Sequence, residues 1–152
     1  MKLAEALLER KSIKQKVDNL QQQLEENAMV QEGDAPAEAP ETLLAELGDA
    51  IARLELLIKG INAANNVATL PNGSTVAEAI VRRDMLKLQR QALERIVEAT
   101  STRHLRYGRN EVRFVRTLKA ADVRRDIDRL SQEWRDLDAQ IQAKNWLTDV
   151  GS

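Results

Sequence analysis

Residues 40–66 read PETLLAELGDAIARLELLIKGINAANN, and their apolar residues recur every three or four positions. The repeat consists of Leu43, Leu44, Leu47, Ile51, Leu54, Ile58 and Ile61. This spacing places the apolar side chains on one face of an α-helix, and Pro40 suits its first position. A narrow apolar stripe on a polar helix is typical of coiled coils and long hairpins. We therefore predict a helix over residues 40–66 in an all-α fold.

The segment before this helix carries a similar pattern. Its stripe consists of Leu3, Leu7, Ile13, Val17, Leu20, Leu24 and Ala28, with Arg10 in the position of a hydrophobe. This stripe predicts a helix over residues 2–30. The acidic stretch at residues 31–39 contains Gly33 and Pro36 and has no periodicity, so we predict a mobile loop there. Because the loop is short, the two helices should form an antiparallel hairpin.

Two more helices are predicted after residue 70. Residues 70–73 (LPNG) have the composition of a turn, and Thr75 and Glu78 have the spacing of a capping box. A helix should begin there and run over residues 75–102, with an apolar set broad enough for neighbours on two sides. A narrow stripe then predicts a helix over residues 120–146. This last stripe consists of Val123, Ile127, Leu130, Trp134, Leu137 and Ile141.

The four predicted helices fit one domain over residues 1–152, either as a four-helix coiled-coil-like bundle or as long antiparallel hairpins. Narrow stripes bury little area within one chain. We therefore predict a homo-oligomer, a dimer or larger, in which copies of the chain add helix-to-helix contacts.

Composition excludes several kinds of chemistry. The chain has no cysteine and one histidine, so we expect no metal site and no cofactor. No catalytic motif is present, and we assign no catalytic residue. The N-terminus has no uninterrupted apolar core of the kind found in signal peptides, so we predict a cytoplasmic protein. No window approaches the 18 apolar residues of a membrane-spanning helix.

The stretch RHLRYGRNEVRFVRTLK at residues 103–119 departs from the helical pattern. It carries a net charge of +5, whereas residues 1–50 carry −6. The alternation over residues 111–118 predicts a short extended segment, which should pair with its own preceding residues or with a second subunit. Arginine offers planar donors to phosphate or carboxylate, so the segment is also a candidate anion site. The candidate residues are Arg103, Arg106, Tyr107, Arg113 and Arg116. These arginines could instead pair with the acidic residues of the N-terminal third.

Two further polar groups have alternative interpretations. The amide run at residues 62–66 contains Asn62 and Asn65, which either close the end of a helix or form the polar wall of a small-molecule pocket. Arg83 and Asp84 lie among apolar residues of the third helix. They either form a half-buried pair that defines the register of two helices, or face the asparagines and complete a ligand site.

Several short motifs resemble a family of small bacterial helical proteins labelled septicolysin or uncharacterised. The motifs are MKLAEALL at residues 1–8, NAMVQEG at 27–33, RRDML at 82–86, YGRNEVRFVRT at 107–117 and the pair Asn145–Trp146. The resemblance implies an all-helical fold and no established activity. The label implies a cytolysin, but the chain shows neither a secretion signal nor a membrane helix.

The sequence therefore supports two main hypotheses. The first is a non-enzymatic, oligomeric helical scaffold or interaction protein whose segment at residues 103–119 forms the subunit contact. The alternative is an anion- or nucleotide-binding protein, including an enzyme, that uses this segment. A net charge of −1 disfavours nucleic acid as the partner.

Overall fold

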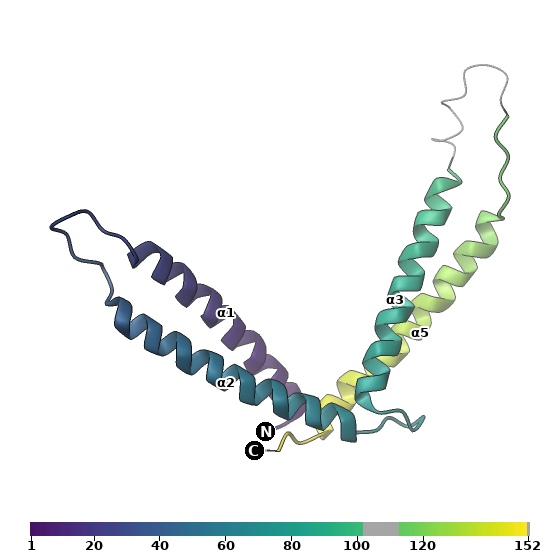
Figure 1. The fold of residues 1–152 in the computed structure, drawn as a ribbon. Coiled ribbons are helices and arrows are strands. Elements are labelled where there is room, and N and C mark those ends of the chain that lie inside the picture. Colours follow the sequence, from purple (N-terminus) through teal and green to yellow (C-terminus); the bar gives the residue numbers. More distant parts are fainter. Residues whose placement is uncertain (102–112, 152) are drawn as a thin grey trace. The chain divides into compact units, whose positions relative to one another are not determined.

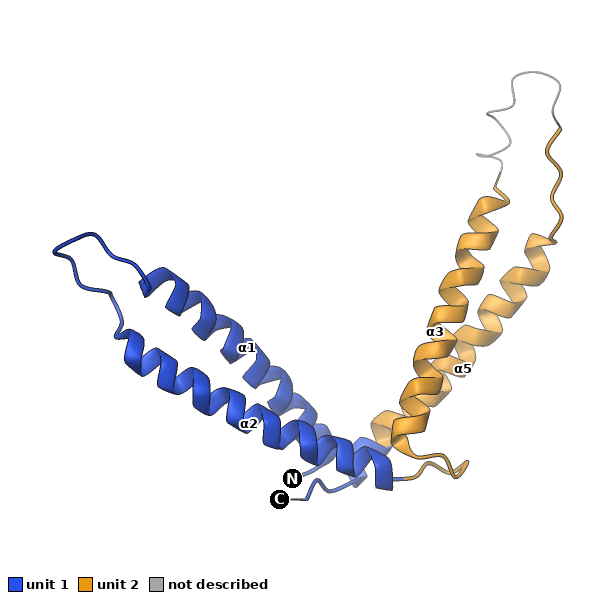
Figure 2. Ribbon diagram, viewed as in Figure 1, with its two compact units in different colours: residues 1–68, 144–152 blue, residues 69–143 orange. Residues whose placement is uncertain are grey.

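The computed structural model describes residues 1–101 and 113–151, in which the chain is all-α and has no strand. The helices are α1 (Leu3–Asn27), α2 (Pro40–Val67), α3 (Val76–Ala99) and α5 (Ala120–Leu147) (Figure 1). The chain divides into two compact units (Figure 2). Unit 1 contains residues 1–68 and the end of the chain from Lys144, and unit 2 contains residues 69–143. The predicted all-α fold is confirmed, and the single domain over residues 1–152 stays a prediction.

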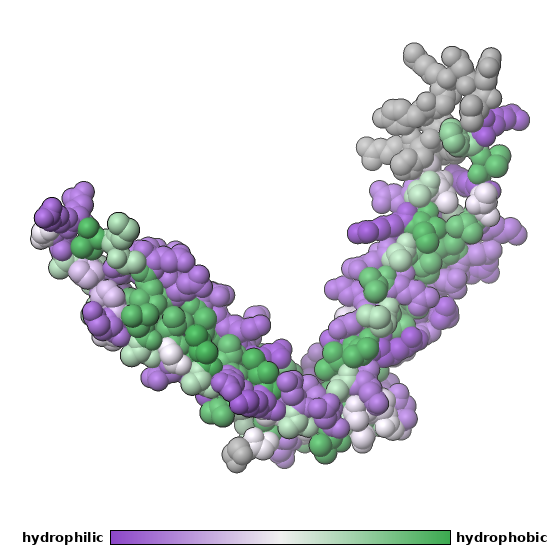
Figure 3. Space-filling model, in the orientation of Figure 1, coloured by the Kyte–Doolittle hydropathy of each residue, from purple (hydrophilic) through white to green (hydrophobic). Residues whose placement is uncertain are grey.

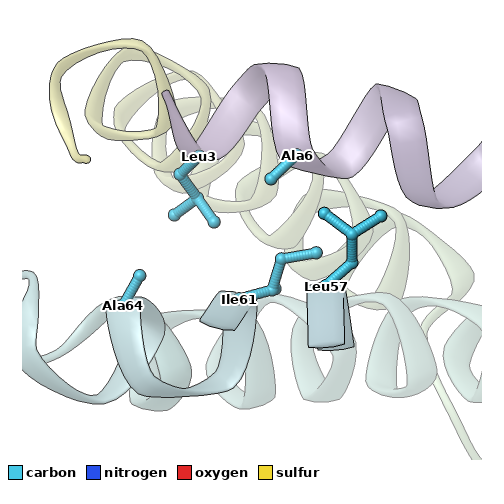
Figure 4. Packing of buried hydrophobic residues seen from close by; sticks show 5 residues of the cluster. All are labelled: Leu3, Ala6, Leu57, Ile61 and Ala64. Carbon is cyan, nitrogen blue, oxygen red and sulfur yellow. The ribbon is translucent and has the colours of Figure 1, made fainter. Parts of the chain in front are cut away.

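In unit 1, α1 and α2 form the predicted antiparallel hairpin. Near the start of α1, Leu3 and Ala6 point toward Leu57, Ile61 and Ala64 from the end of α2 (Figure 4). At the other end of the hairpin, the buried cluster consists of Leu20, Leu43 and Ala50. Fully burying a leucine or isoleucine side chain contributes roughly 1.5–3 kcal/mol, so these two clusters hold the hairpin together.

Helix α1 ends at Asn27, three residues before the predicted end. The side chain of Asn27 donates a hydrogen bond to the carbonyl of Gln23 at 2.8 Å and accepts one from the Glu38 amide at 3.1 Å. An asparagine that bonds to the last turn competes with helix continuation. The same side chain also ties the far end of the connecting loop to α1.

The predicted turn and capping box between α2 and α3 are both present. The Gly73 amide donates to the Leu70 carbonyl at 2.9 Å, and Gly73 adopts a φ of 86°. The Glu78 amide donates to Thr75 Oγ1 at 3.1 Å, and the Thr75 amide donates to Glu78 Oε2 at 2.8 Å. These reciprocal bonds satisfy two amides at the start of α3 that have no partner within the helix.

In unit 2, α3 and α5 lie side by side (Figure 1), joined by ion pairs. Helix α3 ends at Ala99, three residues before the predicted end, and the hydroxyl of Thr100 bonds to the Val97 carbonyl at 2.7 Å. Residues 113–116 form neither helix nor strand. Because residues 102–112 lie outside the described residues, pairing of the segment at residues 111–118 stays a prediction.

The two ends of the chain pair within unit 1. The Leu3 amide donates to the Thr148 carbonyl at 2.8 Å, and the Val150 amide donates to the Met1 carbonyl at 2.9 Å. The ammonium of Lys2 lies 2.8 Å from the Asp149 carboxylate, and this contact holds the pKa of Asp149 below its ordinary value. Val150 also packs against the cluster formed by α1 and α2. We call this arrangement of Met1–Leu3 with Thr148–Gly151 the terminal clasp.

The terminal clasp depends on the absence of a side chain at Gly60. A Cβ atom there would lie 2.7 Å from Cγ1 of Val150, whereas one at Gly48 would meet nothing within 4 Å. We expect Gly48→Ala to stabilise the protein by about 0.5–1 kcal/mol, because alanine favours a helix over glycine. Gly60→Ala should not show this increase, because its methyl group displaces Val150. Thermal unfolding followed by circular dichroism measures both variants, and equal increases would contradict the role of Gly60.

Candidate functional site

Helix α2 has three parallel rows of apolar side chains, and α1 covers only part of them. The row facing α1 is buried and consists of Leu43, Ala50, Leu57 and Ala64. Beside it, Leu47 and Leu54 are half-buried. The third row remains exposed, with Leu44 at 58%, Ile51 at 49% and Ile58 at 36%. The narrow stripe expected from the sequence is therefore a broad apolar band with one uncovered side, which we call the outer row of α2.

Helix α3 carries apolar residues on two opposite faces, as its broad apolar set predicted. Val76, Ala79 and Leu86 are buried. The opposite face exposes Val81 (61%), Met85 (48%), Leu88 (57%) and Ile96 (39%). These residues recur at nearly helical spacing and form the outer row of α3. In the space-filling view, apolar side chains form bands along both units (Figure 3).

Helices α1 and α5 expose fewer large apolar side chains, namely Leu8 on α1 and Trp146 and Leu147 at the end of α5. On α5, Arg129 pairs with Glu133 at 2.9 Å and with Asp126 at 3.6 Å. Such pairs between residues three or four positions apart lie on one helix surface and favour contact with water. Each unit therefore combines one helix that has a single apolar stripe with one helix that has an additional, exposed apolar row.

Arg83 and Asp84 form part of a cross-helix ion pair. Arg83 Nη1 donates to Asp138 Oδ1 of α5 at 2.7 Å, and its Nε lies 3.5 Å from Asp84 Oδ1. The side chains of Arg83 and Asp138 are 23% and 26% exposed, whereas Asp84 is mostly exposed. The half-buried pair is therefore that of Arg83 with Asp138, which joins α3 to α5, and Asp84 is a second, exposed neighbour of the guanidinium. A role of Arg83 and Asp84 in a ligand site stays a prediction. The sequence gives no signal that pairs Asp138 with Arg83, because the two residues are 55 positions apart and only the fold brings them together.

The remaining candidate residues fall in different places. Asn62 is exposed and Asn65 half-buried in α2, whose end is closed by the Ala68 amide bonding to the Ala64 carbonyl at 2.9 Å rather than by an asparagine side chain. Arg103, Arg106 and Tyr107 lie outside the described residues. Arg113 is exposed.

Arg116 lies at the end of α3, where its Nε donates to the Thr100 carbonyl at 2.7 Å. A cation is stabilising at the carbonyl end of a helix, so this bond supports a structural role for Arg116. Arg83 lies in α3, and Thr100, the residue that Arg116 contacts, directly follows this helix 17 positions later. The two arginines are therefore separated by roughly 25 Å along the helix. Unit 2 therefore does not bring Arg83 and Arg116 together, and anion binding by the basic segment stays a prediction.

A groove of about 490 Å³ lies beside the terminal clasp in unit 1. Its walls include Leu56, Leu57, Gly60 and Val150, with Arg53 and Lys59 at its edge. Arg53 makes a two-pronged contact with Glu9 of α1, from Nε to Oε1 at 2.8 Å and from Nη2 to Oε2 at 3.0 Å. These bonds hold the pKa of Glu9 below its ordinary value of 4.5. The sequence gives no signal for this groove beyond a glycine in the helical pattern.

Neither a metal-binding cluster nor a membrane-spanning helix occurs in the part of the chain that the structure describes. Within residues 1–101 and 113–151, no three His, Asp or Glu side chains gather closely enough to hold a metal ion. Among the same residues, no helix has the length and apolar character needed to cross a bilayer.

The fold and its exposed rows define an all-α protein made of helical hairpins with uncovered apolar faces. The family described as "Family of unknown function (DUF6847)" matches residues 10–150, and the chain belongs to this family. A crystal structure of a functionally unknown conserved protein from Corynebacterium diphtheriae is similar, with a TM-score of 0.92, 37% identity and coverage of 99% of each chain. No curated protein matches the chain. Neither match refers to a septicolysin, so that resemblance stays a prediction.

The half-buried pair in unit 2 can be tested by removing one charge at a time. Asp138→Asn should destabilise the protein by roughly 1–2 kcal/mol, because the Arg83 guanidinium loses a charge-assisted hydrogen bond. Asp84→Asn is the matched control and should change stability by less than about 0.5 kcal/mol, since an exposed pair contributes little. Urea unfolding measures both. Equal effects would contradict the assignment of Asp138 as the main partner.

The contact between Glu9 and Arg53 predicts a pH dependence. Because folding lowers the pKa of Glu9 from 4.5, its contribution to stability is present above that value and is lost as the pH falls further. Glu9→Gln should therefore lose less stability than the unmodified protein between about pH 6 and pH 3. Chemical unfolding across this range measures the difference, and parallel curves would exclude a contribution from Glu9.

Proposed function

We propose that the protein is a non-enzymatic helical interaction protein that associates with further copies of itself. The observation that carries this proposal is the outer row of α2, where Leu44, Ile51 and Ile58 recur every seven residues and remain exposed. A period of seven is the repeat by which one helix packs along another. Apolar residues scattered over the surface of a monomer would not be expected to recur with this period.

The outer row of α3 provides independent support from unit 2. Its members lie on the face opposite the buried residues of α3, so one helix has apolar contacts to offer on two sides. Singly scattered apolar side chains are normal on a protein surface, whereas several exposed along one helix face are the pattern that marks an interaction site. Covering both rows with helices from another copy would complete bundles of more than two helices, in which every apolar row has a neighbour.

The proposal locates the main subunit contact on these helix faces. The sequence pattern instead predicts the contact in the segment at residues 103–119, of which residues 103–112 lie outside the described residues. Phe114, Val115 and Leu118 are exposed at the end of this segment and could extend a contact made by the helices. The outer rows of α2 and α3 lie within the described residues, and their exposure and spacing support the proposed contact.

Replacing one residue of the outer row tests the proposal. Sedimentation equilibrium at micromolar concentration should show a dimer or larger species for the unmodified protein. Ile51→Glu should weaken association at least about tenfold, because it removes apolar contact and places a charge in the interface. Leu8→Glu is the matched control, since Leu8 is 61% exposed on α1. An unmodified protein that sediments as a monomer would refute self-association.

A further inference from the structure

The outer row of α2 has a symmetry that bears on how two copies would pair. Leu44 and Ile58 lie seven residues before and after Ile51. A two-fold axis at Ile51 would place Leu44 of each copy against Ile58 of the other and bring the two Ile51 side chains together. A two-fold interface uses the same patch on both subunits, and in an antiparallel pair each residue meets the one equally far on the other side of the centre of the row.

Charges along the edge of the row match the same arrangement. The edge away from α1 carries the exposed residues Glu41, Ala45, Gly48, Ala52, Glu55 and Lys59. In an antiparallel pair, equivalent edges of the two helices face each other. Glu41 and Lys59 lie ten and eight residues from Ile51, so Glu41 of one copy would lie beside Lys59 of the other. Within its own helix the Lys59 ammonium also contacts the Glu55 carboxylate, so the contact across the interface would be shared with that pair. The small residues between them leave room for the helix backbones to approach.

We propose that α2 packs antiparallel against α2 of a second copy, about a two-fold axis at Ile51, with Glu41 beside Lys59 across the interface on both sides. This inference rests on the proposed self-association and specifies its partner, orientation and register. The chemistry it requires is an apolar helix face with an acidic residue, Glu41, near one end of its edge and a basic residue, Lys59, near the other, and α2 carries that face.

Other ways of pairing two α2 helices leave more apolar side chains of the outer row without an apolar partner. Moving the two-fold axis to residue 57 would pair Glu55 with Lys59, but it would place Ile51 opposite the asparagine run at residues 62–66 and leave Leu44 uncovered. A parallel pair would bring the edge of one α2 against the side of the other that α1 already covers. The amides that follow Ile58 therefore limit the apolar row and disfavour a shifted register.

Cross-linking between single cysteines tests the arrangement, since the natural chain has no cysteine. With a short bis-maleimide, Ile51→Cys should cross-link to itself, and Glu41→Cys mixed with Lys59→Cys should form a mixed dimer. Lys59→Cys alone is the control, because two copies of residue 59 would lie roughly 24 Å apart along the helices. Both expected products should form roughly a hundredfold faster than this control at micromolar protein, since association holds the paired thiols at millimolar effective concentration.

Charge reversal gives a second measurement. Glu41→Lys and Lys59→Glu should each weaken the dimer by roughly two- to thirty-fold, because each change disrupts two symmetric surface pairs. The double variant should recover the part of this loss that comes from the pairs between subunits, since it restores both with the charges exchanged, whereas the contact of Lys59 with Glu55 within the helix stays lost. A double variant as weak as the sum of the two changes would contradict the charge pairing.

The outcomes separate this inference from the proposed function. A protein that sediments as a dimer but whose Ile51→Cys variant does not cross-link, or whose Lys59→Cys variant cross-links with itself, overturns the antiparallel arrangement and leaves self-association intact. A protein that sediments as a monomer overturns self-association and the arrangement together. Cross-linking in the expected pairs, with a dimer in sedimentation, supports both.

Discussion

One helix can cover only one side of another, and this constraint accounts for most features of the molecule. In unit 1, α1 buries the row of Leu43, Ala50, Leu57 and Ala64, but it cannot reach Leu44, Ile51 and Ile58 on the adjoining side of α2. In unit 2, α5 leaves a second face of α3 exposed in the same way. A hairpin with one two-sided helix is incomplete as a packing unit, and the proposed association supplies the missing neighbour.

Polar contacts determine how the helices align. An apolar seam alone tolerates a shift by one heptad, because the same side chains then meet again. The half-buried contact of Arg83 with Asp138 and the two-pronged contact of Arg53 with Glu9 each exist at one register only. A shift would leave the half-buried Arg83 and Asp138 without their partners, which costs more than the contact itself contributes.

Polar contacts also align the two terminal stretches in the terminal clasp. Its backbone hydrogen bonds and the ion pair between Lys2 and Asp149 hold the C-terminal stretch against the start of α1. Gly60 provides the space into which Val150 fits. These contacts hold residues 1–3 and 148–151 in place against the cluster formed by α1 and α2.

The sequence by itself determined the all-α class, the four helices to within about three residues at each end, the capping box at Thr75 and the hairpin of α1 and α2, because these follow from local spacing and local hydrogen bonds. It also indicated that α3 has two apolar faces. Only the tertiary structure decided which of the apolar residues of α2 are covered, that Arg83 contacts Asp138, and that Gly60 receives Val150. These features depend on which segments become neighbours in space, and the periodicity of a single helix carries no information about the width or position of its partner.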